Sequence, residues 1–316
     1  MSNESWTVDA PGRLAAEVKR RLDLSHRRAQ ALIDRGAVEV DGARVTDHGH
    51  PLCAGAQVRV SIDAPRRPAQ ESTPPGEILH EDSHIIVVHK RAGVLTVPRD
   101  AQRELPAHLR EPNLEDWLRA RDLARGERPR IGIVQRLDRG TSGVLVFPRT
   151  RHARESLKPA FARHDVTRRY LAIALGRPPI AEGTLRDLLV EKHGRMTIAH
   201  PTEPGAKEAI THYRVIAKSG EGRGEPVACR LELTLETGRR NQIRLSCARA
   251  GFPLLGDRTY GTASELIARP ALHAAHLGFT HPHTGERMAF TVEEPEDLRA
   301  AWRGLLGEAP PEDEAP

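Results

Sequence analysis

The first part of the chain carries apolar residues at helical spacing. Leu14, Val18 and Leu22 recur every four residues, as on one face of a helix. A second apolar set follows Ser25, a residue that favours helix N-termini, and stops at Gly36, a residue that favours helix C-termini. This pattern predicts two short helices.

The next positions alternate between valine and polar residues, as in half-buried strands. Asp41 and Gly42 form a two-residue turn signal within that alternation and predict a hairpin. We therefore expect a small α+β domain over residues 12–62, preceded by a disordered N-terminus, residues 1–11. Residues 63–76 are rich in proline and lack apolar periodicity, so they are expected to form a semi-extended linker.

Beyond the linker, β-branched runs are separated by stretches with helical spacing. Strands are expected at Ile85 to Val88, Ile131 to Val134, Val144 to Phe147, Tyr170 to Leu175 and Cys229 to Leu235. Leu157 and Phe161 lie four apart, as in a helix, and NQIRLSCARAG predicts another helix that stops at Gly251. Long strands with few helices favour an α+β fold with a mixed, mainly antiparallel sheet over residues 77–304. The acidic residues 305–316 are expected to be disordered.

Composition narrows the class of protein. The mean hydropathy is -0.51, and no apolar run approaches the ~18 residues that cross a bilayer. The N-terminus lacks the apolar core of a signal peptide, and three scattered cysteines do not form a disulfide framework. We expect a soluble, monomeric protein of the reducing cytoplasm, without a membrane partner.

Positive charge is concentrated in the middle of the chain. The net charge is +5, but residues 128–177 contain twelve Arg or Lys against three acids. Such a stripe attracts polyanions, of which nucleic acid is the commonest. The alternative is a solvated, arginine-rich surface without a partner.

One carboxylate, Asp138, stands inside this basic stretch, in the sequence VQRLDRGTSG. It follows the expected strand 131–134 and precedes a glycine-rich turn, so we expect it at a strand end facing a cleft. Neighbouring arginines favour its ionised form, which could act as a nucleophile. The alternative is that Asp138 caps the turn by accepting backbone N–H groups.

Part of the N-terminal region resembles a known RNA-binding module. The sequence RLDLSHRRAQALIDRGAVEVDGARV is similar to the S4 module, in which two short helices and a hairpin present basic residues to structured RNA. The resemblance implies RNA contacts for Arg20, Arg27 and Arg28. Gly55 and Ala56 depart from the Gly-Asp that the S4 family usually has at that turn.

The catalytic region resembles the RluA-type pseudouridine synthases. RLDRGTSG matches the family signature, and four further segments match in order, namely ILHEDSHIIVVHKRAGVLTVP, RRYLAIALG, TGRRNQIRLSCARAGFPLLGDRTYG and LHAAHLGFTHP. The matches span residue 77 to about residue 298. The resemblance implies an isomerase that detaches uracil from its ribose, rotates it and reattaches it through C5, without a cofactor or a metal.

The resemblance also implies roles for individual residues. Asp138 is the implied nucleophile, attacking either ribose C1′ or uracil C6. Tyr170 is implied to pack on the flipped uracil and to take the ribose proton in a glycal-type route. Arg244 is implied to pair with Asp138, and Arg136 to enter the space that the flipped base leaves.

Further RNA contacts are expected close to these residues. Arg139 flanks the nucleophile, and Arg239 and Arg240 precede a helix start, where guanidinium and backbone N–H groups can hold a phosphate. Gln242 is grouped with them as an RNA-contact residue. The chain departs from the family at several positions: Gln135 replaces the usual His, Arg240 and Asn241 replace Thr-His, Leu245 and Ser246 replace Val-His, and His89 and Arg91 vary Asn-Lys-Pro.

Several alternatives stay open. His273, His276, His281 and His283 have spacings that could ligate zinc, but an apolar strand and the family resemblance account for them. The expected substrate is ribosomal RNA, and transfer RNA is the second choice; precursors of the ribosomal subunits are possible partners. The main alternative function is a non-catalytic RNA-binding or ribosome-assembly protein with the same fold. A metal-dependent nuclease is disfavoured, because no carboxylate cluster is evident.

Overall fold

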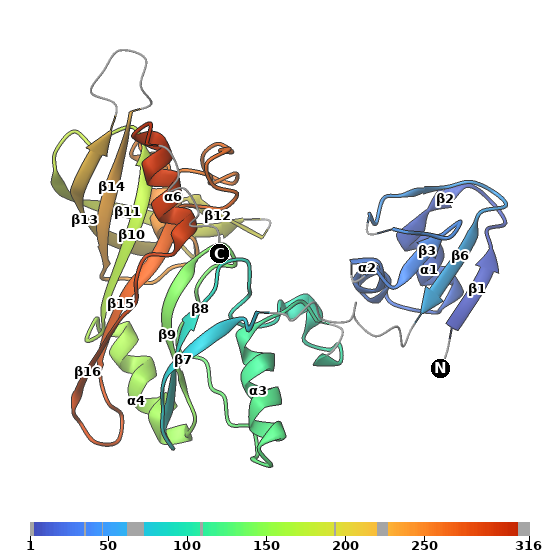
Figure 1. Ribbon diagram of the computed structural model, residues 1–316, viewed down its shortest axis with the longest axis horizontal. Helices are drawn as coiled ribbons and strands as arrows, with labels where there is room; N and C mark the ends of the chain where they lie inside the picture. Colours follow the sequence, from blue (N-terminus) through green and yellow to red (C-terminus); the bar gives the residue numbers. More distant parts are fainter. Residues whose placement is uncertain are drawn as a thin grey trace, which may run out of the picture. The chain divides into compact units, whose positions relative to one another are not determined.

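The computed structural model describes residues 3–34, 36–45, 47–61, 73–107, 110–192, 194–219 and 227–308. The chain divides into two compact units (Figure 1). The first unit comprises Met1–Pro75 and Val97–Trp117, and the second comprises Gly76–Thr96 and Leu118–Pro316. Most of the predicted linker and the tail from residue 309 lie outside the described residues.

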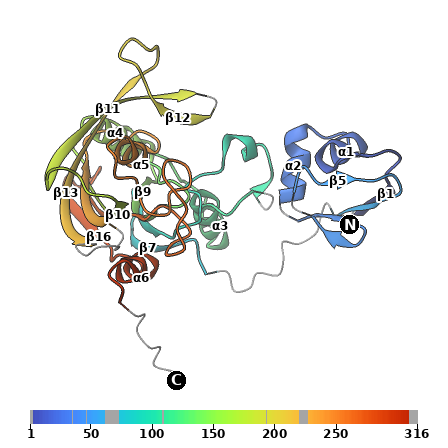
Figure 2. The same ribbon diagram turned by 90° about the horizontal axis from the view of Figure 1, so that it is seen from above.

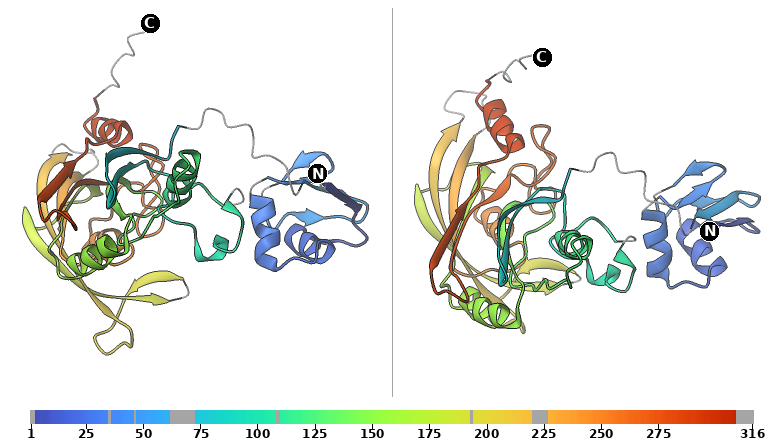
Figure 3. Two further views of the ribbon diagram at one scale, coloured as in Figure 1. Left: turned by 90° about the horizontal axis from the view of Figure 1, so that it is seen from below. Right: turned by 60° about the horizontal axis from the view of Figure 1, so that its bottom comes forward.

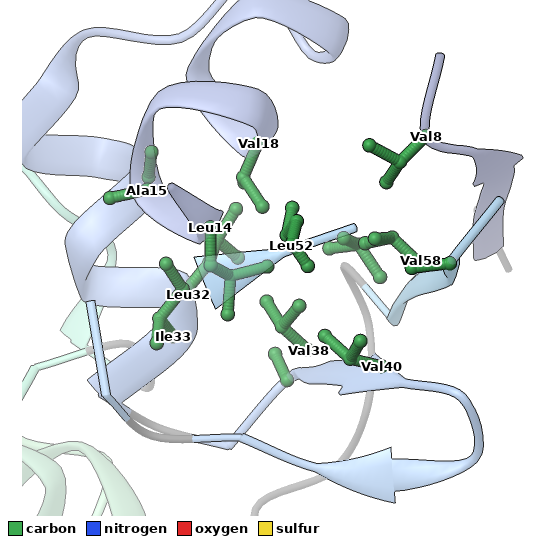
Figure 4. Packing of buried hydrophobic residues seen from close by; sticks show 14 residues of the cluster. Val8, Leu14, Ala15, Val18, Leu32, Ile33, Val38, Val40, Leu52 and Val58 are labelled. Atoms are coloured by element: carbon green, nitrogen blue, oxygen red, sulfur yellow. The ribbon is translucent and has the colours of Figure 1, made fainter. Parts of the chain in front are cut away.

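The N-terminal part of the first unit packs two helices on a small sheet. The helices are α1 (Leu14–Arg21) and α2 (His26–Asp34). The four-stranded sheet has the order β1 (Asn3–Thr7), β6 (Gln57–Ser61), β3 (Val38–Val40) and β4 (Ala43–Arg44), and a separate pair consists of β2 (Gly12–Arg13) and β5 (Pro51–Leu52). Figure 4 shows the core that they enclose, in which Leu14, Val18, Ile33, Val38 and Val58 are almost fully buried.

Local sequence signals account for these elements. The Ser25 hydroxyl accepts the Arg28 N–H (3.3 Å) at the start of α2, as a capping serine does. Between β3 and β4, Asp41 and Gly42 have φ of +50° and +80°, the two left-handed residues that a tight hairpin of this kind requires. The predicted helix pair and hairpin are confirmed.

Within the predicted disordered segment, residues 1–11, the structure describes residues 3–11, and these are not disordered as predicted, because Asn3–Thr7 pairs antiparallel with β6. Trp6 packs on the core, and its indole N–H donates to Glu17 of α1 (3.1 Å). The strand contains a single large apolar residue, so it shows no alternation. Backbone hydrogen bonds to an open sheet edge and one aromatic side chain stabilise it instead.

A ten-stranded sheet forms the body of the second unit (Figures 1 and 2). Its order is β12 (Arg195–Ile198), β11 (Glu182–Lys192), β13 (Lys207–Ser219), β14 (Ala228–Leu235), β10 (Thr167–Leu175), β15 (Leu272–Thr280), β9 (Ser142–Pro148), β8 (Ile85–Lys90) and β7 (Gly76–Glu81), with β16 (Arg287–Thr291) paired to β15. Every pairing in this sheet is antiparallel except that of β9 with β15. The predicted α+β fold with a mixed, mainly antiparallel sheet is confirmed.

The remaining helices are η1 (Asp100–Gln102), α3 (Leu114–Ala124), α4 (Arg151–Ala162), α5 (Gln242–Arg249) and α6 (Glu296–Leu305). Thr150 begins α4 by accepting the Ala153 N–H (3.0 Å), and Leu157 and Phe161 of α4 are buried in a core with β8 and β9 residues. Trp302 of α6 packs in a different core, with residues of β10. Figure 3 shows α4 and α6 at separate parts of the sheet. Each helix therefore covers its own section of apolar surface.

Residues 131–134 form a loop and not the predicted strand. Ile131 is buried, and the Gly132 N–H donates to the Pro148 carbonyl at the end of β9 (2.7 Å). A run of β-branched residues thus indicates that the segment is buried, and a loop can be buried as well as a strand. Asp138 accordingly does not follow a strand; it lies in a loop that leads into β9.

The parallel junction between β9 and β15 depends on one glycine. Only two residue pairs form it, Ser142 with His273 and Gly143 with Ala274. Gly143 has φ of +125°, and a Cβ built there would lie between 2.2 and 2.6 Å from the backbone of Ala274. No other residue type fits this contact, so Gly143 permits the two halves of the sheet to join.

We expect Gly143→Ala to destabilise the second unit more than Gly251→Ala does. Gly251 also has positive φ, at +88°, but a Cβ there would meet nothing within 4 Å. Both variants carry the conformational cost, and only Gly143→Ala adds the backbone clash, so we expect about 2 kcal/mol of additional destabilisation. Thermal unfolding would show this as a Tm lower by roughly 4–8 °C. Equal losses in the two variants would contradict the role of the contact.

Candidate active site

The loop that carries Asp138 is fixed on the segment that follows β8. The Thr96 hydroxyl accepts the Leu137 N–H (3.0 Å) and donates to the Leu137 carbonyl (2.9 Å). The Arg139 side chain donates to the Gly93 carbonyl (3.0 Å), and the Gly93 N–H donates back to the Arg139 carbonyl (2.8 Å). These four bonds define the position of Asp138 between Leu137 and Arg139.

Lys90, at the end of β8, contacts this loop and is fully buried. Its ammonium donates to the carbonyls of Arg91 (2.9 Å), Val94 (2.7 Å) and Arg139 (3.3 Å). Burial lowers the pKa of Lys90 to about 7, although Asp138 opposes that shift. Sequence reasoning missed Lys90. The sequence signal that could have identified it is its position at the end of an apolar strand, residues 85–90.

Arg244 on α5 joins two carboxylates. Its Nε and Nη2 each donate to one oxygen of Asp257 at 2.7 Å, in the planar two-bond arrangement that guanidinium groups favour. Its Nη1 points to Asp138 Oδ2 at 3.4 Å. Asp257 is fully buried and also accepts the backbone N–H groups of Thr259 (3.0 Å) and Tyr260 (3.2 Å). Sequence reasoning missed Asp257, although, like Asp138, it is an acid followed directly by an arginine.

The Asp138 carboxylate faces Arg244, and a backbone hydrogen bond closes the turn. The Thr141 N–H donates to the Asp138 main-chain carbonyl (3.0 Å), so the turn does not depend on the side chain. The side chain keeps 26% of its surface accessible, which leaves room for contact with a substrate. These contacts favour the catalytic interpretation of Asp138 over the turn-capping one.

The electrostatics of Asp138 differ from the expectation. Burial raises the pKa of Asp138, and the opposing effects of Arg244, Lys90 and Arg240 do not cancel that rise. The neighbouring arginines do favour the ionised form, as expected. Their effect on the pKa of Asp138 is, however, smaller than the effect of burial. Removal of the carboxylate from water is the larger effect.

Tyr170 lies within electrostatic range of Asp138. It belongs to β10 and is 8% exposed. Burial raises the pKa of Tyr170; Arg168 lowers it, and Asp138 raises it further. Opposite Tyr170, the β10–β15 register shifts between Arg169 and Leu171, so the sheet is irregular at this point. The fold thus brings Asp138, Tyr170 and Arg244 together from a loop, a strand and a helix.

Comparison with known proteins identifies the family. The sequence model of the RNA pseudouridylate synthases matches residues 84–249. A ribosomal large subunit pseudouridine synthase D from Zymomonas mobilis is 33% identical over 312 residues, which cover 95% of this chain and 94% of the relative. The chain belongs to the RNA pseudouridylate synthase family. It is an RNA pseudouridine synthase, an isomerase, and the non-catalytic alternative is disfavoured.

Other relatives agree with this assignment. An uncharacterized RNA pseudouridine synthase of Chloroflexus aurantiacus is 36% identical over 326 residues, covering 98% of the synthase and 96% of that relative. The solved structure of human RNA pseudouridylate synthase domain containing 1 aligns with a TM-score of 0.55 and 23% identity, covering 72% of the synthase and 88% of that chain. That likeness shows a shared fold.

Most of the arginines predicted to contact RNA reach the surface of the synthase. Arg136, Arg139 and Arg239 are exposed, and Arg239 also donates to the Glu208 carbonyl (3.0 Å). Arg240 is partly buried; it pairs with Glu191 (3.0 Å) and donates to the Gly194 carbonyl (2.5 Å). The first three can meet a phosphate, whereas Arg240 is partly engaged by the β11–β12 hairpin.

Gln242 does not fit the prediction that it contacts RNA. It is 2% exposed, and its amide donates to the Ile210 carbonyl (3.0 Å) and to Thr211 (3.0 Å). Its oxygen accepts the Thr237 hydroxyl (2.8 Å) and the Arg239 N–H (2.9 Å). Gln242 therefore fixes the turn before α5 inside the protein and is not available to a substrate.

The basic stretch 128–177 is not one continuous free surface. Arg149 pairs with Glu81 (2.6 Å) and Glu127 (2.9 Å), and Arg168 is 7% exposed. Two further arginines pair with neighbouring acids, Arg151 with Glu155 and Arg163 with Asp165. Charge counted along the sequence thus overstates the positive surface that RNA can reach.

The N-terminal arginines are only partly described. Arg20 and Arg28 are exposed, and Arg20 pairs with Glu17 (2.8 Å) on the same helix. The backbone of Arg27 lies in α2, but its side chain lies outside the described residues. Their RNA contacts stay a prediction.

His273 in β15 and His281 just after that strand both have protein partners. His273 Nδ1 lies 2.9 Å from the Ser142 hydroxyl, and His281 Nε2 lies 3.0 Å from Asp82. Within the part of the chain that the structure describes, no group of three or more His, Cys, Asp or Glu residues is arranged to hold a metal ion. None of the described helices has both the length and the apolar character that crossing a bilayer requires.

We expect the buried Lys90 to make stability depend on pH. Its pKa is about 7 in the folded chain and 10.5 in the reference state, so between these values the unfolded chain binds more protons. Its contribution to the free energy of unfolding therefore rises as pH increases from 7 to 10. Urea unfolding of wild type and Lys90→Met should show a difference that grows in favour of wild type between pH 7 and 9.5. A difference that stays constant or shrinks would contradict the lowered pKa.

Proposed function

We propose that the synthase isomerises uridines in ribosomal RNA with Asp138 as the nucleophile. The observation that carries the proposal is the contact of a partly buried, partly accessible carboxylate with Arg244 (3.4 Å), beside Tyr170. Ribosomal RNA is favoured because the relative from Zymomonas mobilis, which aligns over nearly its whole length, is named a ribosomal large subunit pseudouridine synthase. The monomeric state and the cytoplasmic location stay predictions.

The proposed reaction breaks the bond between ribose C1′ and uracil N1 and forms a bond between C1′ and C5. C5 loses its proton to solvent and the freed N1 takes up a proton, so the product is an isomer of the substrate. Asp138 attacks either ribose C1′ or uracil C6, and the resulting adduct retains the substrate while the base rotates. Tyr170 is suited to pack against the base beside Asp138 and to accept a ribose proton in a glycal-type route.

A base in a stacked helix cannot reach a partly buried carboxylate, so the target nucleotide has to leave the stack. Arg136 is two residues from Asp138 and exposed, which supports a role in filling the space that the base leaves. Arg139 and Arg239 are further exposed guanidinium groups for the phosphates of the same strand.

The N-terminal helix pair is proposed to act as an S4-like RNA-binding module. Its two helices, its hairpin and the exposed Arg20 and Arg28 support this assignment. A second contact of this kind would favour structured RNA over single strands, because two binding elements on one chain raise the effective affinity for a large target.

Asp138→Asn should abolish the reaction while RNA binding persists. The substitution preserves shape and removes the nucleophilic charge, so we expect a loss of at least roughly 10³-fold in tritium release from RNA labelled at uracil C5. Binding of the same RNA should change less than about threefold. The matched control is Asp165→Asn, a carboxylate that is 59% exposed and paired with Arg163. Full activity of Asp138→Asn would exclude a nucleophilic role.

Substrate choice is testable with unmodified transcripts of large-subunit ribosomal RNA, small-subunit ribosomal RNA and transfer RNA. We expect tritium release to be at least about tenfold faster from the large-subunit transcript, and to reach a plateau at a fixed number of uridines per molecule. Faster release from transfer RNA would reject ribosomal RNA as the substrate and leave the isomerase assignment intact.

A further inference from the structure

Asn241, immediately before α5, uses its side chain in an unusual way for its position. An asparagine at a helix start ordinarily accepts a backbone N–H of the first turn, but Asn241 makes no such cap. Its Oδ1 instead accepts Arg244 Nη1 (3.3 Å), and its Nδ2 donates to the Tyr260 hydroxyl (3.1 Å). The amide therefore joins the active-site arginine to a tyrosine outside α5.

The backbone of Asn241 is adapted to this use. Its φ is +55°, in the left-handed region that asparagine enters more readily than most residues. That conformation turns the side chain away from the helix start and toward Arg244. Asn241 therefore has a backbone conformation that is unfavourable for most residues, and its side chain does not cap the helix.

Tyr260 secures the other end of the link. Its hydroxyl donates to the Met196 carbonyl of β12 (3.2 Å), and the guanidinium of Arg244 lies over its ring at 5.2 Å from the centroid. The guanidinium of Arg195 lies 5.4 Å from the same centroid. The tyrosine is therefore held by the β11–β12 hairpin, which Figure 2 shows extending from the sheet.

These contacts decide where Nη1 of Arg244 points. Asp257 accepts one N–H from Nε and one from Nη2, and Nη1 is the nitrogen that contacts Asp138. The contact between Nη1 and Asp138 is long at 3.4 Å, whereas a charge-assisted bond is usually ~2.7–2.9 Å. A contact of this length is easily lost when the guanidinium tilts about its bonds to Asp257, and Asn241 and Tyr260 oppose that tilt.

We propose that Asn241 and Tyr260 are positioning residues that hold Nη1 of Arg244 against Asp138 during the isomerisation. The proposal rests on the proposed function, in which Asp138 is the nucleophile. It also gives a physical role to Asn241, one of the positions at which the chain departs from the family pattern. The neighbouring departure, Arg240, contributes by bonding the same segment to the hairpin through Gly194 and Glu191.

The test uses Asn241→Gly, Tyr260→Phe and the double variant in the full-length synthase. Glycine tolerates φ of +55°, so Asn241→Gly removes the amide without adding backbone strain. Tyr260→Phe keeps the ring under Arg244 and removes only the hydroxyl. Tyr213→Phe is the matched control, because Tyr213 loses the same hydroxyl from a ring that packs on Phe252 (5.6 Å).

We expect kcat for tritium release to fall about tenfold in Asn241→Gly and about threefold in Tyr260→Phe, with KM for RNA changed less than twofold. The double variant should be no slower than Asn241→Gly, because both substitutions break one link. Tyr213→Phe should match wild type. Each fall should exceed the loss of folded protein measured by thermal unfolding.

The pH profile separates positioning from a merely structural role. Asp138 is faced by Arg244 and Arg240 from the α5 segment, by Lys90 from β8 and by Tyr170 from β10. Of these groups, Arg244 is the one that the Asn241 side chain contacts, so we expect Arg244 to be the one whose orientation changes in Asn241→Gly. Its lowering effect on the pKa of Asp138 should weaken, so the acidic limb of the kcat profile should move to higher pH.

The outcomes are distinct. Wild-type kcat and an unmoved acidic limb in Asn241→Gly, together with an inactive Asp138→Asn, would overturn the positioning role and leave the proposed function standing. The positioning role would also be overturned if the fall in kcat were no larger than the loss of folded protein and the acidic limb of the kcat profile did not move. An absence of tritium release from wild type would overturn both proposals.

Discussion

The candidate active site depends on one guanidinium that contacts two carboxylates unequally. Arg244 makes two short bonds to the buried Asp257 and one long contact to Asp138. The hydrogen bonds from Arg244 and the backbone outweigh the effect of burial and lower the pKa of Asp257, whereas at Asp138 burial is the larger effect and raises the pKa. The two carboxylates bonded to one arginine thus have pKa values shifted in opposite directions, which distinguishes Asp257, the acid that holds Arg244, from Asp138, the proposed nucleophile.

The fold assembles this arrangement from segments that are far apart in the chain. Asp138 is 106 residues from Arg244, and it enters the site through the loop before β9. The parallel pairing at Gly143 joins that loop to β15, and β15 pairs with β10, which carries Tyr170. The close backbone approach at Gly143 is therefore a condition for the site and not only for the sheet.

Sequence patterns predicted the elements that have local periodicity. They failed where a contact between distant segments determines the structure. The family motif located Asp138 and Arg244, because short motifs preserve the order of a site. The burial of Gln242 could not be read from the sequence, because the same turn also carries exposed arginines. Lys90 was missed because its partners are backbone carbonyls, which have no sequence signature. The loop at 131–134 was taken for a strand because β-branched residues signal burial in either structure.

The long contact between Arg244 and Asp138 has a chemical consequence. A carboxylate that accepts two short bonds from a guanidinium has its lone pairs directed at that partner and is a poor nucleophile. Asp257 takes this tight arrangement, so Arg244 stays in place while Asp138 keeps accessible oxygen surface. Partial burial then removes water from Asp138, and a less solvated anion gives up less solvation when it attacks. For the proposed nucleophile, the positive charge has to lie nearby without making short hydrogen bonds to it. A second, buried acid that holds the arginine meets both conditions.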